Sequence, residues 1–257
     1  MRVADAVEGL DEGIRLVGFG RMCPVNILHS SLWTSEGRGV AMYRCEAETE
    51  AGFVQQLAVS YLGHGFCFYV AGEIPATKDP ATIDAKLIAR YGIGISRWAR
   101  ARRKKAGFAN MHYLRFGRFF VLLATHGEHR FFRDEPRFKD ARRDPIRFAG
   151  YSISLKRGRD GRLHPSVRIH PDEYRKLKAY FLDLAPHRTI ENLAAAFAAV
   201  PFERYAPVRR QLLNIWRAAN RAREQAGYEP APLAILRLRR RVVRAFPEQG
   251  EPARAAA

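Results

Sequence analysis

The sequence has few acidic residues, few cysteines and no long apolar run, and each shortage argues against a class of protein. Only three cysteines occur in 257 residues, and no two of them form a CxxC pair. This usage suits a reducing compartment and gives little support to a structural zinc site. No stretch approaches the roughly 18 apolar residues of a membrane-spanning helix. The acidic N-terminus does not resemble a signal peptide. We therefore expect a cytoplasmic protein with no membrane association.

The common signatures of catalytic and nucleotide-binding sites are also missing. There is no GxGxxG between a strand and a helix, no GxxxxGK[ST], no GxSxG and no HExxH. The sequence therefore leaves open whether the protein is an enzyme. It also does not decide whether translation starts at Met1 or at Met42.

Positive charge is the most abundant feature of the chain. Against 26 Asp and Glu stand 44 Lys and Arg, which gives a formal net charge of +18 and a pI near 10.4. From Ala85 to Gly127 there are ten Lys or Arg and no acid. Such charge destabilises a compact state by self-repulsion unless a polyanion neutralises it. The basic segments lack the apolar face that a membrane-surface helix needs, so the pattern favours DNA or RNA.

Composition divides the chain into four parts. We expect a poorly ordered extension over residues 1–50, a core domain over 51–186, a basic helical domain over 187–246 and a disordered tail over 247–257. The core domain contains alternating strand and helix patterns. The predicted fold class is therefore α+β, a mostly antiparallel sheet with packed helices, followed by a C-terminal all-helical domain.

Local signals place the elements of the core domain. Helices are expected at 52–62, after Asp79-Pro80 and from Ser96 to Gly107, and another opens at Pro171. Strands are expected at 65–74, 110–116, 118–125, 146–155 and 166–170, with a charged connection over 128–145. The strand around RFFVLLAT is apolar on both faces, which indicates a central position in the sheet. The C-terminal domain is expected to hold helices over 191–200, capped by Thr189, and over 207–226.

Eleven cations are the candidate contacts for a phosphate backbone. Six lie in the helix Arg97–Lys105, whose sequence has no acid and almost no apolar face, so we expect its partner to lie outside the protein. Two lie on the hairpin, and three share one face of the 207–226 helix. The full set is Arg97, Arg100, Arg102, Arg103, Lys104, Lys105, Arg115, Arg118, Arg210, Arg217 and Arg221. Aromatic residues of the hairpin suit either the core or base stacking, and the core is the more common use: Tyr113, Phe116, Phe119 and Phe120.

Two closely spaced histidines, His126 and His129, follow the apolar strand. Side chains can converge on a metal where strands end, so the pair is a candidate site for a divalent ion such as Mg²⁺ or Mn²⁺. A later helix carries Tyr174 and Lys178, a candidate nucleophile and its neighbour. The order resembles in plan the HUH-type replication initiators and transposases, in which a strand carries His-apolar-His and a later helix carries Tyr. This chain has His-Gly-Glu-His instead, and Tyr174 shares a face with apolar residues, so we do not assign it to that family.

The sequence thus supports three hypotheses of different kinds. The first is a nucleic-acid-binding protein that contacts phosphates through basic helices. The second is a metal-dependent nuclease or nicking enzyme of a mobile element, with His126, His129, Tyr174 and Lys178 as catalytic residues. The third is an assembly factor for a ribosome or for an acidic protein partner. The oligomeric state is not predicted.

Overall fold

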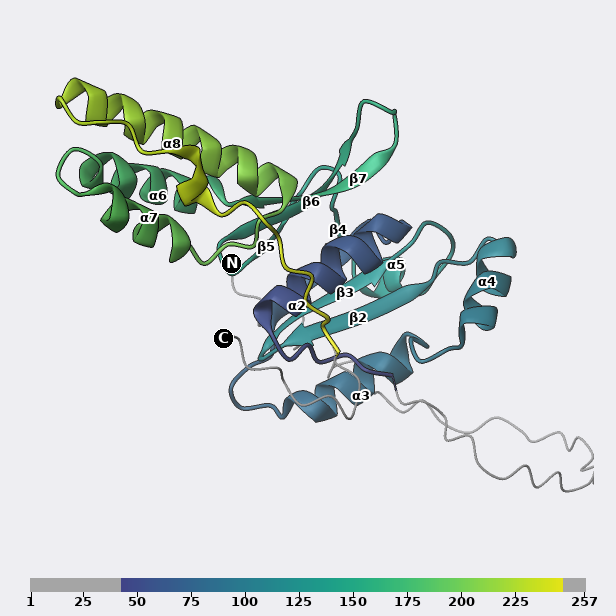
Figure 1. Ribbon diagram of the computed structural model, residues 1–257. Helices are drawn as coiled ribbons and strands as arrows, with labels where there is room; N and C mark the ends of the chain where they lie inside the picture. Colours follow the sequence, from purple (N-terminus) through teal and green to yellow (C-terminus); the bar gives the residue numbers. More distant parts are fainter. Residues whose placement is uncertain (1–42, 247–257) are drawn as a thin grey trace, which may run out of the picture.

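The protein has an α+β fold, as predicted, and its described residues form seven α-helices and two antiparallel sheets (Figure 1). The computed structural model describes residues 43–246. In the first sheet the strand order is β2-β3-β1-β4. Its strands are β1 (Phe68–Glu73), β2 (Met111–Phe116), β3 (Phe119–Ala124) and β4 (Lys139–Asp140). No helix of the described part of the chain is long and apolar enough to cross a membrane.

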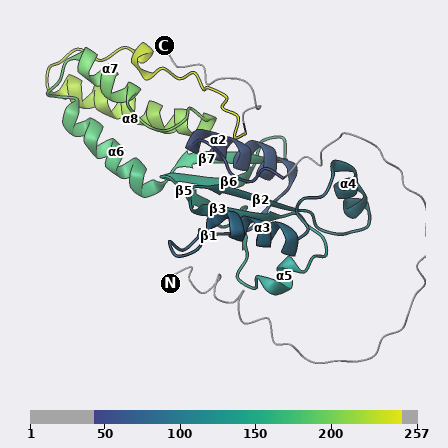
Figure 2. The same cartoon turned by 90° about the horizontal axis from the view of Figure 1, so that it is seen from below.

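The β2–β3 hairpin is the centre of the first sheet. Gly117 makes the turn with a φ of 56°, and β3 pairs with both β2 and β1. Val121 and Leu123 of β3 pack on the side of α2 (Glu50–Gln55), whereas Leu122 packs on the side of α3 (Pro80–Arg90). Figure 2 shows the sheet between these two helices. The prediction that this strand is central and buried on both faces is confirmed.

The second sheet corrects the prediction of a single strand over 146–155. The structure has β5 (Ile146–Phe148) and β6 (Tyr151–Arg157) there, joined by a tight turn. Ala149 and Gly150 both have positive φ, 44° and 76°, which is the backbone that a two-residue hairpin turn requires. The sheet is completed by β7 (Leu163–Ile169) in the order β5-β6-β7.

Helix boundaries follow the capping signals of the sequence closely. Thr49, Asp79 and Ser96 each accept a backbone N–H at the start of a helix. The expected 52–62 helix is present as α2, a π-helical stretch (Gln56–Tyr61) and a 3₁₀ turn (Leu62–His64). The charged connection also contains α5 (Phe131–Asp134) and β4, which are too short for a periodic pattern to predict.

The C-terminal helices form a layer of their own with α6. This layer consists of α6 (Pro171–Leu184), α7 (Ile190–Ala198) and α8 (Ala206–Gln225), which lie together in Figure 1. Phe181 of α6 stacks on Phe197 of α7 with ring centroids 3.9 Å apart. The buried residues of α7 and α8 are continuous with those of α2 and β6 in one hydrophobic cluster. The core therefore crosses the expected boundary at residue 186.

Residues 43–50, which were predicted to belong to a poorly ordered extension, are part of the fold. The Ala47 N–H donates to the Arg115 carbonyl at 2.8 Å, and the Arg115 N–H donates to the Cys45 carbonyl at 2.7 Å. The segment after α8 also returns to this region, where the Glu48 N–H donates to the carbonyl of buried Ala245. The predictions for residues 1–42 and 247–257 lie outside the described residues.

Candidate nucleic-acid interface

Helix α4 (Arg97–Lys105) lies at one edge of the molecule, away from the other helices in both views (Figures 1 and 2). None of its residues is buried. Its C-terminus is closed by Gly107, whose φ is 82° and whose N–H donates to the Lys104 carbonyl. The next N–H, that of Phe108, donates to the Arg103 carbonyl, which completes a Schellman motif. The helix therefore has a capped C-terminus but contributes no buried residue to the core.

Two of its arginines attach α4 to the sheet. Arg100 donates to the carbonyls of Met111 and Ile93 at 2.6 and 2.5 Å, and burial lowers its pKa. Arg103 donates to the Ala109 carbonyl at 3.1 Å. Burial does not hold this helix, as its sequence indicated; these hydrogen bonds attach it, and an external partner remains a prediction. Arg100 and Arg103 position the helix, and the remaining cations are the ones free to meet a ligand.

The opposite side of α4 is open to solvent. Trp98 is 79 % exposed, and Arg102 and Lys105 follow it at spacings of four and seven, on the same face. Arg97 and Lys104 are also exposed. None of these four cations pairs with an acid within the part of the chain that the structure describes. The exposed cations of α4 thus form an uncompensated positive surface.

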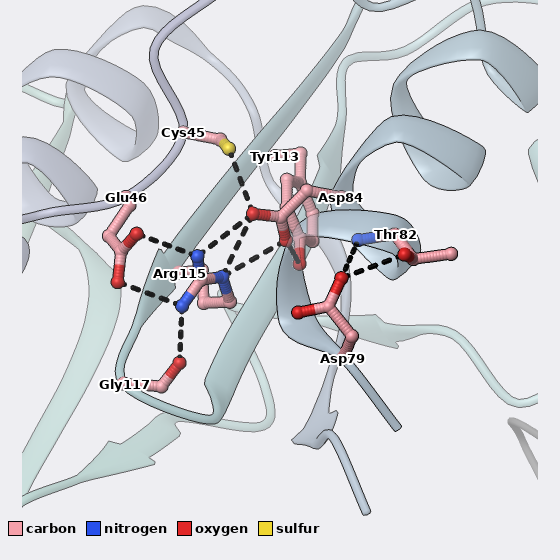
Figure 3. Close-up of polar contacts among 8 residues, drawn as sticks. All are labelled: Cys45, Glu46, Asp79, Thr82, Asp84, Tyr113, Arg115 and Gly117. Atoms are coloured by element: carbon pink, nitrogen blue, oxygen red, sulfur yellow. Dashed lines mark hydrogen bonds and ion pairs between the residues drawn. The ribbon is translucent and has the colours of Figure 1, made fainter.

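Arg115 does not belong to that surface, and its assignment as a phosphate contact is corrected. Its side chain is 6 % exposed and lies between two carboxylates (Figure 3). The Nε atom is 3.0 Å from both oxygens of Asp84, and the terminal nitrogens donate to Glu46 at 2.9 and 2.8 Å. The Tyr113 hydroxyl also donates to Asp84 at 2.6 Å. A cation held on both sides in this way has no donor left for a phosphate.

Arg118 is exposed, but its guanidinium organises the loop before α3. It donates to the carbonyls of Pro75 and Ala76 at 2.5 and 3.2 Å, and to those of Ile74 and Lys78 at 3.2 Å. Three of these carbonyls share the two N–H groups of one terminal nitrogen, and the fourth accepts from the other terminal nitrogen. Arg118 therefore has a structural role that its sequence context did not indicate.

The aromatic residues of the hairpin are core residues. Tyr113 and Phe120 are buried, and Phe116 and Phe119 pack against Phe53 and the second sheet. The interpretation as core, rather than as a stacking platform, is the one that the structure supports.

The arginines of α8 form a second exposed stripe. Arg210, Arg217 and Arg221 are all exposed, and Arg217 and Arg221 line a groove beside residues 230–232. In both views α8 lies far from α4 (Figures 1 and 2). The two basic helices therefore do not form one continuous contact surface.

Two other arginines of this region are buried and were not singled out from the sequence. Arg223 donates to the carbonyls of Ala185 and Arg188 after α6, and Arg204 donates to the Phe197 carbonyl near the end of α7. Each donates hydrogen bonds to carbonyls near a helix C-terminus, where the helix dipole favours a cation. These two cations are thus buried on backbone carbonyls and are not available to a ligand.

The two histidines lie near each other but have different environments. His126 is exposed, and its ring meets Phe68 edge-on at 4.7 Å. His129 Nδ1 accepts the Phe131 N–H at 3.1 Å, and burial, with the nearby Arg103 charge, lowers the pKa of its imidazole. Within residues 43–246 no group of three or more His, Cys, Asp or Glu is arranged to hold a metal ion. The structure therefore brings no further ligand to the pair.

Tyr174 and Lys178 are also remote from these histidines. Both lie half-buried on α6, and Tyr174 packs against the hydrophobic cluster. Figures 1 and 2 place α6 and α5, which follows the histidines, in different parts of the molecule. The four residues proposed for a nicking site are not brought together.

A cleft of about 590 Å³ connects the end of α4 with the start of α5. It brings together one helix cation, one of the predicted histidines and two arginines that the sequence did not single out. Its lining residues are Arg103, Phe108, Glu128, His129, Arg130, Phe132 and Arg133. The only sequence signal for Arg130 and Arg133 was the charged, aromatic connection in which they lie.

No model of a known protein family matches the chain, and searches of curated proteins and of solved structures likewise return no match. The functional argument therefore depends on the geometry of the chain itself.

Proposed function

We propose that the protein binds nucleic acid through its phosphate backbone, with α4 as the main contact. The observation that carries this proposal is the set of exposed cations of α4: Arg97, Arg102, Lys104 and Lys105 have no acidic partner among the described residues. Neutralising phosphates releases condensed counterions, which supplies affinity without any sequence-specific contact.

The setting of α4 supports the same function. Arg100 and Arg103 attach its inner side to the sheet, so the outer cations project from a fixed frame. Pre-positioned charges lose less entropy on binding than charges on a flexible segment. Arg133 of α5 is exposed nearby in the cleft and extends the positive surface beyond α4.

The arginine stripe of α8 is proposed as a second, separate contact with phosphates. Arg210, Arg217 and Arg221 are exposed on α8, which lies apart from α4 in both views (Figures 1 and 2). A long single strand or duplex can therefore contact α4 and α8 of one protein molecule at the same time, or two nucleic-acid molecules can bind, one at each helix. We further propose a cytoplasmic location, which the scarcity of cysteines supports.

The test is a comparison of two double variants that remove the same charge. Lys104 and Lys105 are adjacent, exposed and unpaired, whereas Arg175 and Lys176 of α6 are adjacent, exposed and paired with Asp172 and Glu173. We expect Lys104→Ala, Lys105→Ala to weaken binding of labelled DNA and RNA of any sequence. The slope of log affinity against log salt should flatten by about 0.7–0.9 per lost contact.

The control, Arg175→Ala, Lys176→Ala, should leave the slope close to that of the wild type. Equal losses in the two variants would mean that net charge alone matters and would remove α4 from the interface. Absence of binding by the wild-type protein to DNA and RNA at low salt would contradict the proposal as a whole.

A further inference from the structure

The cleft between α4 and α5 is built by an unusually close approach of two loops. The Ala109 N–H donates to the Glu128 carbonyl, and the Glu128 N–H donates to the Gly107 carbonyl, both at 3.0 Å. Gly127 makes this possible, because a Cβ atom there would lie 2.5 Å from the Gly107 carbonyl oxygen. Its φ of 125° is also one that glycine adopts readily. Paired backbone groups thus fix the base of the cleft.

Phe108 is an exposed aromatic residue on the wall of this cleft. The residue is 45 % exposed, although its backbone is held by the Schellman bond to Arg103 and by the bridge to Glu128. The Arg103 guanidinium lies 6.0 Å from the ring centroid. Phe132 lines the cleft as well. The cleft therefore offers a fixed, accessible ring face, which is the feature that binds an unstacked base.

Cations stand beside these rings. Arg130 immediately precedes α5, Arg133 lies within it, and both arginines are exposed and line the cleft. Arg130 shares Asp134 with Arg90, whereas Arg133 has no acidic partner among the described residues. The Arg103 Nε is buried and lacks a hydrogen-bond partner within the same residues, a donor that calls for an explanation. Phosphate oxygens would find charge-assisted donors at Arg130 and Arg133.

A second helix end in this protein shows that the motif by itself does not create such a cleft. α8 ends in Gly227-Tyr228, with the Tyr228 N–H donating to the Arg223 carbonyl and the guanidinium 5.6 Å from the ring. Tyr228 is 52 % exposed, much like Phe108. It does not line the groove beside α8. The two helix ends are alike, and the cleft is what distinguishes Phe108.

We propose that this cleft binds one unpaired nucleotide, with its base on Phe108 and its phosphate at Arg130 and Arg133. Glu128 is the one acid among the residues that line the cleft, and its carboxylate can accept a hydrogen bond from an amino group of a base. The same negative charge disfavours a phosphate beside Glu128. This inference rests on the proposed nucleic-acid binding and makes it specific, because a duplex keeps its bases stacked and cannot present one to the cleft. The shared ligand chemistry is a base with a phosphate, from a single strand or from a free nucleotide.

The test separates the ring face from the helix cap. Phe108→Leu keeps an apolar side chain that can pack at the end of α4 but removes the aromatic ring. Phe108→Trp keeps an apolar side chain and an aromatic ring. Tyr228→Leu is the matched control at the other helix end. The probes are labelled single-stranded DNA and RNA, the corresponding duplexes, and AMP. Thermal unfolding of each variant checks that the fold is kept.

We expect Phe108→Leu to weaken single-strand binding by about 5- to 150-fold, the range of one base–aromatic stack. Duplex binding should not change, Phe108→Trp should bind single strands as the wild type does, and Tyr228→Leu should have no effect. Binding of AMP with the same dependence on Phe108 would identify a free nucleotide as the source and support the cleft assignment.

Two results would overturn the inference. In the first, the protein binds duplexes through α4, but its affinities for single strands and for AMP do not depend on Phe108. The proposed nucleic-acid binding would then hold without the nucleotide cleft. The second is an equal loss of single-strand and duplex binding in Phe108→Leu, which would indicate a damaged α4. If the wild type bound neither nucleic acid nor AMP, both proposals would fail.

Discussion

Arg115 of β2 and Asp84 of α3 form an ion pair in which both side chains are almost fully buried, 6 % and 10 % exposed. Glu46 contacts the other side of the same guanidinium, and the Cys45 thiol lies 3.4 Å from Asp84. One arginine therefore connects the segment before α2, the helix α3 and the hairpin (Figure 3). Such a pair contributes little against an apolar replacement but is costly to break on one side.

Arg115→Ala should destabilise the protein by about 3–5 kcal/mol, because it leaves Asp84 as a buried carboxylate without its cation. Urea unfolding measures this change. Arg102→Ala, at an exposed site of α4, should stay within about 0.5 kcal/mol of the wild type. A stable Arg115→Ala variant with weakened nucleic-acid binding would instead return Arg115 to the list of phosphate contacts.

Stability should fall on acidification because of His112. Its ring stacks on Tyr61 at 4.3 Å, and burial, with the nearby Arg100 charge, lowers its pKa to about 3. The unfolded chain, with an ordinary histidine pKa of about 6.5, takes up a proton that the folded protein refuses. Between these two values His112 should therefore cost about 1.4 kcal/mol per pH unit as the pH falls.

The difference between wild type and His112→Phe isolates this contribution, since phenylalanine keeps an aromatic ring beside Tyr61. Urea unfolding from pH 7 down to about pH 4 should show a shallower decline for the variant. His187→Asn, a change of an exposed imidazole, is the control and should follow the wild type. Parallel curves for wild type and His112→Phe would show that His112 is protonated in the folded state.

Gly127→Ala should destabilise the protein and disturb the cleft. A Cβ atom would meet the Gly107 oxygen at 2.5 Å and the Ala109 nitrogen at 2.6 Å, in addition to the strain of a positive φ. Strain of that kind alone costs about 1–3 kcal/mol. Gly161→Ala has a φ of 73° but nothing within 4 Å, so it should show only the backbone term. Equal losses of stability would indicate that the two loops separate without cost.

Tyr174→Phe should change little. Its ring packs partly buried against the hydrophobic cluster, and the substitution keeps nearly all of that volume. The melting temperature and the affinity for nucleic acid should both stay near the wild-type values. If the protein nicks a strand in the presence of Mg²⁺ or Mn²⁺ and Tyr174→Phe abolishes this with stability intact, Tyr174 is a nucleophile and the structural role is wrong.

The elements with strong local signals were predictable from the sequence. Asp79-Pro80 and Ser96 start helices because their side chains accept N–H groups three residues on, and Gly117 turns a hairpin because it adopts positive φ. The apolar strand that follows it was correctly expected to be central. The positive charge of α4 is also a property of composition alone.

Which cations remain free was decided only by the tertiary structure. Arg115 and Lys105 are both cations in an acid-free stretch of sequence, but Glu46 pairs with Arg115 across 69 positions of the chain, whereas no acid among residues 43–246 pairs with Lys105. The cleft likewise depends on Gly127 meeting Gly107, and the separation of α6 from the histidines depends on how the layers pack. Burial and hydrogen bonding of a charged side chain are set by groups distant in sequence. A pattern of neighbouring residues therefore locates the charge, and only the fold shows whether solvent, a carboxylate or a ligand can reach it.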